Sequence, residues 1–228
     1  MRELRPSARC VALLLIVGLT GCAEGTPAVT PRTLHAIGDS ILAWHGEEGA
    51  SIPHVAARTL GWNVRNEAVG GTRVLGGDEA IPTQLPEEAA PWVLVNGGLN
   101  DVNITCDCGA CREVLDALVS EDGRAGGMPT LVRGIRARGS RVLVLGYYAF
   151  PPGAAFGVAR CGDEMHGLNL RLARMAAAHE GVTFVRASPW VSPTHTELYD
   201  GDGVHPSRRG AERLGAALAE AVRAEDRR

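Results

Sequence analysis

The chain has 228 residues, of which 45% are hydrophobic and 21% charged, and its formal net charge is −3. This length and composition are enough for one α/β domain with a sizeable hydrophobic core. The low net charge excludes the basic surface typical of nucleic-acid-binding proteins, so nucleic acid is not expected as a partner.

The first 21 residues have the pattern of an export signal. Three arginines precede the apolar run 11–19, which is too short to span a bilayer as a permanent helix. The run ends in Leu-Thr-Gly-Cys, which looks like a bacterial lipobox, and in such signals the cysteine, here Cys22, is acylated and becomes the mature N-terminus. An ordinary secretory signal cleaved nearby is the alternative. Both interpretations predict that the protein is exported.

Residues 22–32 are rich in Thr, Pro, Gly and Ala, a composition typical of a flexible tether. We therefore expect a protein of the cell envelope that faces the periplasm or the cell surface. Lipid on Cys22 would hold it at a membrane. Residues 33–228 show no internal repeat and no second boundary, so they are predicted to form a single domain.

Short apolar runs alternate with helical patterns throughout this domain. The pattern at 51–61 begins with serine, has proline near its first turn and ends with glycine, and 164–180 has apolar residues at helical spacing. The predicted strands are 33–37, 62–66, 92–96, 141–145 and 182–185. The predicted helices are 51–61, 112–119, 128–138, 164–180 and 206–225.

This alternation predicts a three-layer α/β/α domain with a parallel five-stranded sheet covered on both faces. A flavodoxin-like strand order, 2-1-3-4-5, is expected, and such sheets bind ligands at the carboxyl ends of their strands. Three candidate residues follow strands there: Ser40 after the first, Gly71 after the second and Asn100 after the third.

Four short stretches contain the groups that acyl-transfer chemistry needs. They supply a serine, a glycine, an asparagine amide, and an aspartate three residues before a histidine. Such groups can attack an ester carbonyl and stabilise the oxyanion that forms. The stretches are Gly38-Asp39-Ser40, residues 66–72, Gly98-Leu99-Asn100-Asp101 and Asp202-Gly203-Val204-His205.

The set and its order resemble the SGNH hydrolases, also called the GDSL esterase/lipase family, over about residues 33–222. The resemblance implies the SGNH hydrolase fold and a serine esterase that hydrolyses carboxylic esters through an acyl-enzyme. It implies no cofactor and no metal. The expected substrate is a small-molecule, glycan or lipid ester.

The resemblance also assigns roles to individual residues. Ser40 would be the nucleophile, His205 the general base and Asp202 the acid that orients it. The oxyanion would accept hydrogen bonds from the backbone N–H groups of Ser40 and Gly71 and from the Asn100 amide. Three residues close to these positions are assigned separately. Gly70 replaces Gly71 if the register slips by one, Asp200 is an acid whose spacing to the histidine does not match, and Asp101 is expected to be structural.

The acyl group is not fixed by the sequence. The scarcity of aromatic residues and the lack of an obvious apolar lid favour short acyl groups, including acetyl groups on glycans. A lysophospholipid or another lipid ester, or a thioester, is the alternative substrate. A binding lipoprotein that retains the fold without catalysis is the competing class.

Four cysteines lie in the predicted domain, at Cys106, Cys108, Cys111 and Cys161. An even number in an exported domain predicts two disulfides, and the one-residue spacing of the first two disfavours a bond between them. Two pairings remain open: 106–111 with 108–161, or 108–111 with 106–161. A zinc site of four thiolates is the rival interpretation. The cysteine loop and residues 120–127 are expected to form a stapled wall beside the pocket.

Aromatic residues near the predicted strand ends have two interpretations. Trp44 and His45 follow Ser40 by about one helical turn and either line the acyl pocket or pack in the core. Tyr147, Tyr148 and Phe150 follow the fourth strand, where they either shape the substrate site or pack a loop.

Overall fold

The computed structural model describes residues 32–76 and 79–228. The predicted signal, Cys22 and the tether up to residue 31 lie outside these described residues, so the export and lipidation assignments stay predictions. Within the described ranges, no helix is both long enough and apolar enough to cross a membrane.

A parallel sheet of five strands forms the centre of the described domain, in the order β2-β1-β3-β4-β5. The order and the parallel pairing confirm the fold predicted from the alternating pattern. Each strand lies within one residue of its predicted bounds. The strands are β1 (Thr33–Ile37), β2 (Asn63–Asn66), β3 (Trp92–Val95), β4 (Arg141–Leu145) and β5 (Val182–Val185).

The three central strands form the middle of the hydrophobic core. All four residues of β3 are buried, as are the last four of β1 and of β4, because helices cover both faces of the sheet. The edge strands β2 and β5 are only half-buried or exposed over most of their length. In the parallel pairing, Leu34 of β1 lies beside Trp92 of β3, and Trp92 lies beside Arg141 of β4.

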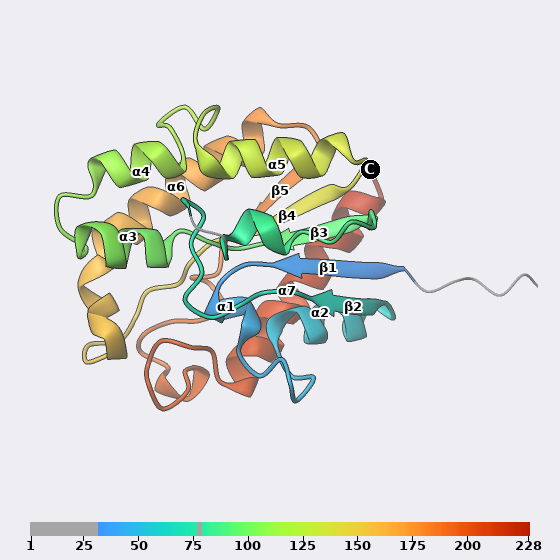
Figure 1. Ribbon diagram of the computed structural model, residues 1–228. Coiled ribbons are helices and arrows are strands. Elements are labelled where there is room, and N and C mark those ends of the chain that lie inside the picture. Colours follow the sequence, from blue (N-terminus) through green and yellow to red (C-terminus); the bar gives the residue numbers. More distant parts are fainter. Residues whose placement is uncertain (1–31, 77–78) are drawn as a thin grey trace, which may run out of the picture. The chain divides into compact units, whose positions relative to one another are not determined.

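Two helical layers enclose the sheet (Figure 1). Helices α2 and α7 pack against each other on one face, while α5 packs on β4 and α6 on β5 on the other. The α-helices are α1 (Ser40–Ala43), α2 (Ile52–Leu60), α3 (Leu99–Cys106), α4 (Arg112–Leu118), α5 (Gly127–Ala137), α6 (Gly162–Ala178) and α7 (Arg208–Asp226). The 3₁₀ helices are η1 (Ile81–Gln84), η2 (Ala155–Cys161) and η3 (Thr196–Leu198).

Helices α1 and α3 were not among the predicted helices, and both begin at the carboxyl edge of the sheet. Asp39 caps α1, because its carboxylate accepts a hydrogen bond from the N–H of Ile41 at 2.9 Å. Gly98 begins α3 with a φ of 120°, a backbone conformation that favours glycine. Both helices are too short to show a periodic apolar pattern.

One glycine is required by close packing where β1 passes into α1. A Cβ on Gly38 would lie 2.8 Å from the backbone oxygen of Asn96, which belongs to the turn after β3. The turns after β1 and β3 are therefore in direct contact, and each begins a helix that carries a candidate site residue.

Candidate active site

The turns after β1, β2 and β3 and the loop before α7 meet at one pocket of about 860 Å³. The pocket is lined by Ser40, Gly71, Asn100 and His205, so four residues predicted from separate stretches share one cavity. The alternative glycine, Gly70, also lines it. The convergence arises because all the strands are parallel, which places their carboxyl ends at the same edge of the sheet.

Ser40 is the first residue of α1, and the aspartate before it is buried. Asp39 accepts a hydrogen bond from the Tyr147 hydroxyl at 2.5 Å, and the same hydroxyl accepts one from the N–H of Leu99 at 3.1 Å. Tyr147 therefore links the start of α1 to the start of α3. Burial raises the pKa of Asp39 to about 6, although the hydrogen bonds from Tyr147 and from the Ile41 N–H act in the opposite direction.

The side-chain amide of Asn100 is oriented by the turn after β2. Its Nδ2 donates to the backbone oxygen of Thr72 at 2.9 Å, which leaves its second N–H available to a ligand. Gly71 next to it has a φ of 79°, a conformation that favours glycine. Within the described ranges, no protein acceptor takes the backbone N–H of Ser40 or of Gly71. Three donors are thus available around one pocket.

A second set of hydrogen bonds fixes these turns relative to one another. The N–H of Gly38 donates to Oε1 of Gln84 at 2.8 Å, and Nε2 of Gln84 donates to Oγ1 of Thr72 at 3.1 Å. The Thr72 hydroxyl donates in turn to the backbone oxygens of Gly38 and Val69. Gln84 lies in η1, far along the chain from Ser40, and no local pattern in the sequence marks it as part of the site.

Asp101 has the structural role expected for it. Its carboxylate accepts hydrogen bonds from the N–H groups of Val74 at 2.9 Å and of Leu75 at 2.8 Å, which ties α3 to the segment after the Gly71 turn. Burial raises the pKa of Asp101, and these two hydrogen bonds partly offset that effect.

His205 and Asp202 form a close pair on the loop before α7. Nδ1 of His205 lies 2.5 Å from Oδ2 of Asp202, and Oδ1 of Asp202 accepts from the N–H groups of Val204 at 2.8 Å and of His205 at 3.0 Å. Burial alone would raise the pKa of Asp202, but the hydrogen bonds from the His205 backbone, its imidazole and Val204 lower it.

This geometry assigns the imidazole tautomer. With a proton on Nδ1 shared with Asp202, the Nε2 atom of His205 is free to accept a proton. Ser40 and His205 line the same pocket, but no hydrogen bond joins their side chains in the part of the chain that the structure describes.

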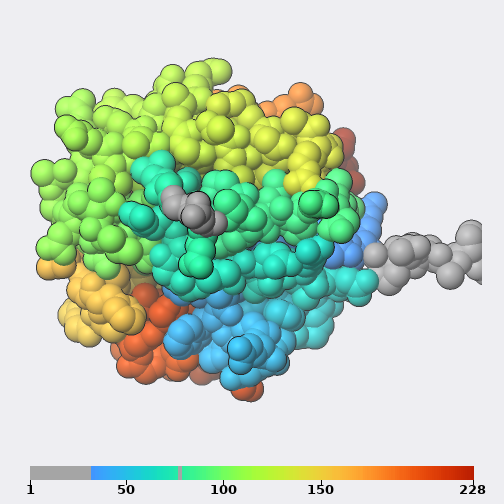
Figure 2. All heavy atoms as spheres, viewed as in Figure 1, coloured from blue at the N-terminus to red at the C-terminus, as the bar shows by residue number. Residues whose placement is uncertain are grey.

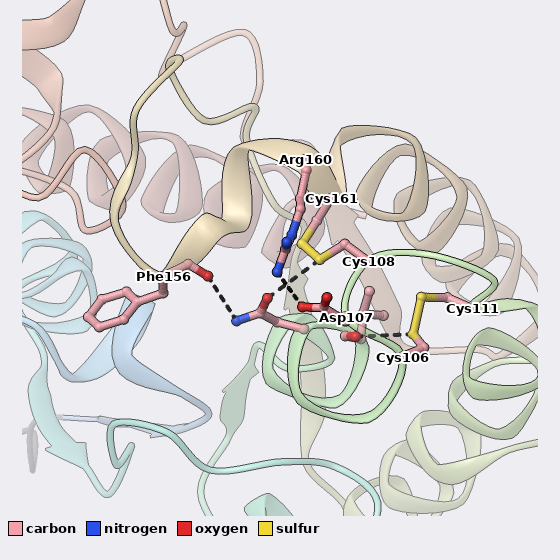
Figure 3. The surroundings of a disulfide bond; sticks show 9 residues. Cys106, Asp107, Cys108, Cys111, Phe156, Arg160 and Cys161 are labelled. Atoms are coloured by element: carbon pink, nitrogen blue, oxygen red, sulfur yellow. Dashed lines mark hydrogen bonds and ion pairs between the residues drawn. A yellow bond between two sulfur atoms is a disulfide. The ribbon is translucent and has the colours of Figure 1, made fainter.

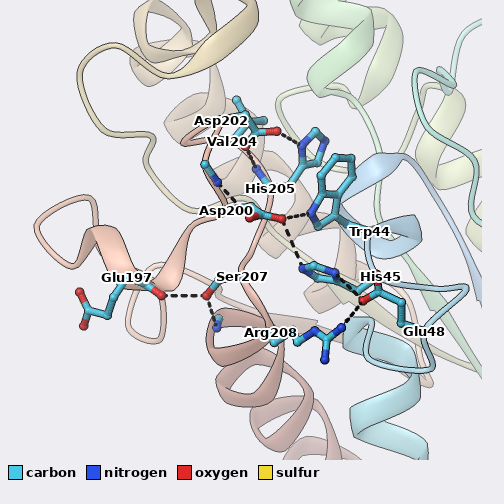
Figure 4. A network of polar contacts seen from close by, with 12 residues as sticks. Trp44, His45, Glu48, Glu197, Asp200, Asp202, Val204, His205, Ser207 and Arg208 are labelled. Atoms are coloured by element: carbon cyan, nitrogen blue, oxygen red, sulfur yellow. Dashed lines mark hydrogen bonds and ion pairs between the residues drawn. The ribbon is translucent and has the colours of Figure 1, made fainter.

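Trp44 and His45 also line the pocket, as one of the two interpretations of these residues predicts. The Trp44 indole is stacked on the His205 ring, and its Nε1 donates to Oδ2 of Asp200 at 2.7 Å. Asp200 is thus not the partner of the His205 imidazole. It belongs to a separate polar network in which His45 also contacts Glu48 (Figure 4).

The side of the pocket formed by α3 and η2 is apolar. Ile104 of α3 and Phe156 of η2 are 61% and 69% exposed, and both line the pocket together with Val158. In the space-filling view, the surface of η2 lies directly beside that of α3 (Figure 2). Asn103 adds a polar contact, since its Nδ2 donates to the backbone oxygen of Phe156 at 3.4 Å.

Two disulfides cross-link the segments that form this apolar side of the pocket (Figure 3). Cys106 is bonded to Cys111 and Cys108 to Cys161, which is the first of the two pairings left open by the sequence. The second bond joins the loop after α3 to the end of η2, next to an ion pair between Arg160 and Asp107. Disulfide sulfurs are not thiolate ligands, and no group of three or more potential ligands in the described ranges is placed to hold a metal.

The structure corrects one expectation about the pocket and decides between two open interpretations. Residues 120–127 do not line it, because this loop packs away from the site, with Gly123 against the backbone of Met175 in α6. Tyr147 and Tyr148 do not line it either. Both are buried, and their hydroxyls bond to Asp39 and to the backbone oxygen of Val204, so of their two interpretations packing is the correct one.

The sequence matches the family model of the GDSL-like lipase/acylhydrolase family over residues 36–213, which is most of the described domain. No curated protein is similar enough to the chain to count as a relative.

Solved structures share the fold at low sequence identity. A protein of Lactobacillus plantarum is 18% identical, with a TM-score of 0.65 over 86% of this chain and 98% of its own. The carbohydrate acetylesterase Est24 of Sinorhizobium meliloti is 19% identical, with a TM-score of 0.56 over 85% and 99%. An aryl esterase of M. smegmatis, solved with an inhibitor, is 17% identical, with a TM-score of 0.56 over 85% and 99%.

Proposed function

Because the chain belongs to the GDSL-like lipase/acylhydrolase family, whose members are hydrolases, we propose that it is a serine esterase with Ser40 as its nucleophile. The observation that carries this proposal is the shared pocket. It brings a serine, three available N–H donors and a histidine paired with an aspartate together from four segments of the chain. These are the groups that acyl transfer requires.

In the first step, Nε2 of His205 takes the proton of the Ser40 hydroxyl as its oxygen attacks the ester carbonyl. The oxyanion accepts hydrogen bonds from the N–H groups of Ser40 and Gly71 and from the free N–H of Asn100. Asp202 stabilises the imidazolium through Nδ1.

In the second step, the imidazolium gives its proton to the leaving alcohol, and the carbonyl re-forms as an ester of Ser40. Water then attacks this acyl-enzyme, with His205 again accepting a proton. The acid leaves and Ser40 recovers its hydroxyl. The cycle uses only groups of this chain, water and the substrate.

We propose carboxylic esters with short acyl groups as the first substrate class, including acetyl esters on glycans. The likeness in fold to a carbohydrate acetylesterase supports the acetyl ester, and the likeness to an aryl esterase supports ester hydrolysis in general. The exposed apolar wall at Ile104 and Phe156 favours a second candidate, a lipid ester whose chain would lie against that wall. We also propose that the enzyme is exported and anchored to the envelope through lipid on Cys22, which palmitate labelling of the wild-type and Cys22→Ser proteins would test.

Hydrolysis of p-nitrophenyl esters of graded acyl length tests this function. The protein from Ala23 onward is compared with its Ser40→Ala variant, and circular dichroism checks that both are folded. Activity that falls with chain length and is absent from the variant is the expected result. A maximum at long chains supports the lipid ester instead. A folded protein with no Ser40-dependent activity on any ester contradicts the esterase and makes the non-catalytic binding lipoprotein the better explanation.

A further inference from the structure

Helix α1 connects the nucleophile to the ring that covers the base. Ser40 begins this four-residue helix, and Trp44 follows its last residue. The backbone N–H of Trp44 donates to the backbone oxygen of Ser40 at 2.9 Å. The Trp44 indole lies on the imidazole of His205, with ring centroids 3.9 Å apart and planes only 9° from parallel. One short segment therefore sets the position of the serine and also covers one face of the histidine.

Asp200 holds the indole in this position (Figure 4). Its Oδ2 accepts the hydrogen bond from Nε1 of Trp44 at 2.7 Å, and its backbone N–H donates to the backbone oxygen of His205 at 2.8 Å. The side chain that holds Trp44 thus belongs to the same loop as the base. The hydrogen bond from the indole lowers the pKa of Asp200, so this carboxylate is charged at neutral pH.

The charged and titratable groups around His205 come from several elements. Asp202 bonds to its Nδ1, Asp200 lies on the same loop, and Asp39 approaches from the turn before α1. Beyond Asp200 the network continues to the side chains of three further residues, His45, Glu48 and Arg208, the last from α7. The carboxylate of Asp202 meets the edge of the imidazole, and the uncharged indole of Trp44 meets its face.

We propose that Trp44, anchored by Asp200, is a positioning residue for His205 that keeps its ring in line with the pocket and stabilises its imidazolium form. The inference depends on the proposed function, in which His205 carries a positive charge after it takes the Ser40 proton. The face of an indole attracts a cation, and a stacked ring also restricts rotation of the imidazole. The charged Asp200 increases the electron density of the indole through its N–H.

Substitution of a residue that only lines the pocket would change the kinetics differently from substitution of a positioning residue. A wall contacts substrate before and during the reaction, so its loss raises KM and leaves kcat nearly unchanged. A residue that favours the imidazolium acts on the transition state, so its loss lowers kcat and moves the acidic limb of the pH profile.

The test compares Trp44→Leu, Trp44→Phe and Asp200→Asn with the wild-type protein on one p-nitrophenyl ester across pH 5 to 9. Trp44→Leu is expected to lower kcat about 10-fold and to move the acidic limb of kcat/KM to lower pH by about half to one unit. Trp44→Phe restores a ring over His205, so it is expected to recover part of the lost kcat. Asp200→Asn keeps an acceptor for the indole N–H but removes the charge, and an intermediate effect is expected.

Trp190→Leu is the matched control, because Trp190 is similarly exposed (38%, against 36% for Trp44) and does not line the pocket. A Trp44→Leu protein with kcat within twofold of wild type, or with only KM changed, overturns the inference. A Trp44→Phe protein no more active than Trp44→Leu also overturns it. The Ser40→Ala variant distinguishes failure of the proposed function from failure of this inference. If Ser40→Ala keeps full activity, the proposed function itself fails, independently of the results for the Trp44 variants.

Discussion

The two sides of the pocket are built in different ways. On the donor side, the turns that carry Ser40, Gly71 and Asn100 follow three adjacent strands and are joined to one another by buried or half-buried hydrogen bonds. On the base side, one loop carries both His205 and Asp202, and its links to the rest of the pocket include the exposed contact between Asp200 and Trp44.

Backbone groups and side-chain groups are oriented by different parts of this one site. The proposed oxyanion donors are mainly backbone groups, so the sheet and the turns that follow it determine where they point. The proposed base is a side chain, so its direction depends on individual contacts made by neighbouring side chains. Substitutions on the donor side should therefore reduce both stability and activity, while those on the base side should reduce activity far more than stability.

The largest effect is expected from Asp202→Asn on the base side. The asparagine cannot stabilise the imidazolium or enforce the same tautomer, so kcat should fall roughly 10⁴-fold. The lowered pKa of Asp202 means that its carboxylate stabilises the fold above its ordinary pKa and loses that contribution as pH falls toward acid values. Steady-state kinetics and thermal unfolding at pH 7 check the expectation. A kcat loss of less than tenfold would remove Asp202 from the mechanism.

Asn100→Ala should have the next largest effect, on the donor side. Loss of one oxyanion donor is expected to lower kcat by about 10²–10³-fold with a smaller change in KM. Asn103→Ala is the matched control, because Asn103 lies on the same helix and lines the same pocket, but its amide bonds to the η2 backbone. Equal losses in the two variants would show that the helix, and not the amide of Asn100, matters.

Tyr147→Phe removes the hydroxyl that links the start of α1 to the start of α3. It leaves the buried Asp39 with one hydrogen bond fewer, and a loss of about 1–3 kcal/mol in the free energy of unfolding is expected. Because the pKa of Asp39 is raised to about 6, the folded protein binds more protons than the unfolded chain between about pH 4 and 6. Stability contributed by this group therefore falls as pH rises through that window, by at most about 1.4 kcal/mol per unit.

The hydrogen bond from Tyr147 lowers the pKa of Asp39, so its loss should extend this window to higher pH. Urea unfolding from pH 4 to 8 measures the effect. Tyr148→Phe is a control on the base side, since this equally buried hydroxyl bonds to a backbone oxygen and not to a carboxylate. The same pH dependence in both variants would contradict the role given to the Asp39–Tyr147 pair.

The smallest effect on catalysis is expected from the disulfides, which hold the outer wall of the donor side. A protein with both Cys108 and Cys161 changed to Ser should lose about 2 kcal/mol more stability than one with Cys106 and Cys111 changed, because its bond spans 53 residues and the other only 5. KM should rise a few-fold as η2 loosens, while kcat changes little. Equal melting temperatures for the two double variants would contradict this account.

The sequence alone predicts much of the fold and the site, because these features follow from local patterns. Apolar runs bounded by turn residues mark the strands, and the parallel order places Ser40, Gly71 and Asn100 at one edge of the sheet. The spacing of Asp202 and His205 on one loop is also local, and the structure brings the two side chains together.

The remaining features depend on contacts between distant segments that no local pattern reveals. Gln84 reaches Gly38 across 46 residues, and Asp200 holds Trp44 across 156. The apolar wall at η2 has no helical periodicity, and a left-handed residue, Phe156, interrupts it. The pairing of the three closely spaced cysteines with one another and with the distant Cys161 likewise depends on which segment packs beside them.

Covalent trapping can show whether Ser40 is the activated nucleophile of this pocket, as we propose. The protein from Ala23 onward is treated with a fluorophosphonate, which reacts with an activated serine, and its peptides are analysed by mass spectrometry. We expect one adduct, on the peptide that contains Ser40, and much slower labelling of the His205→Ala variant. A folded wild-type protein that forms no adduct, or forms one only on another serine, would contradict this proposal.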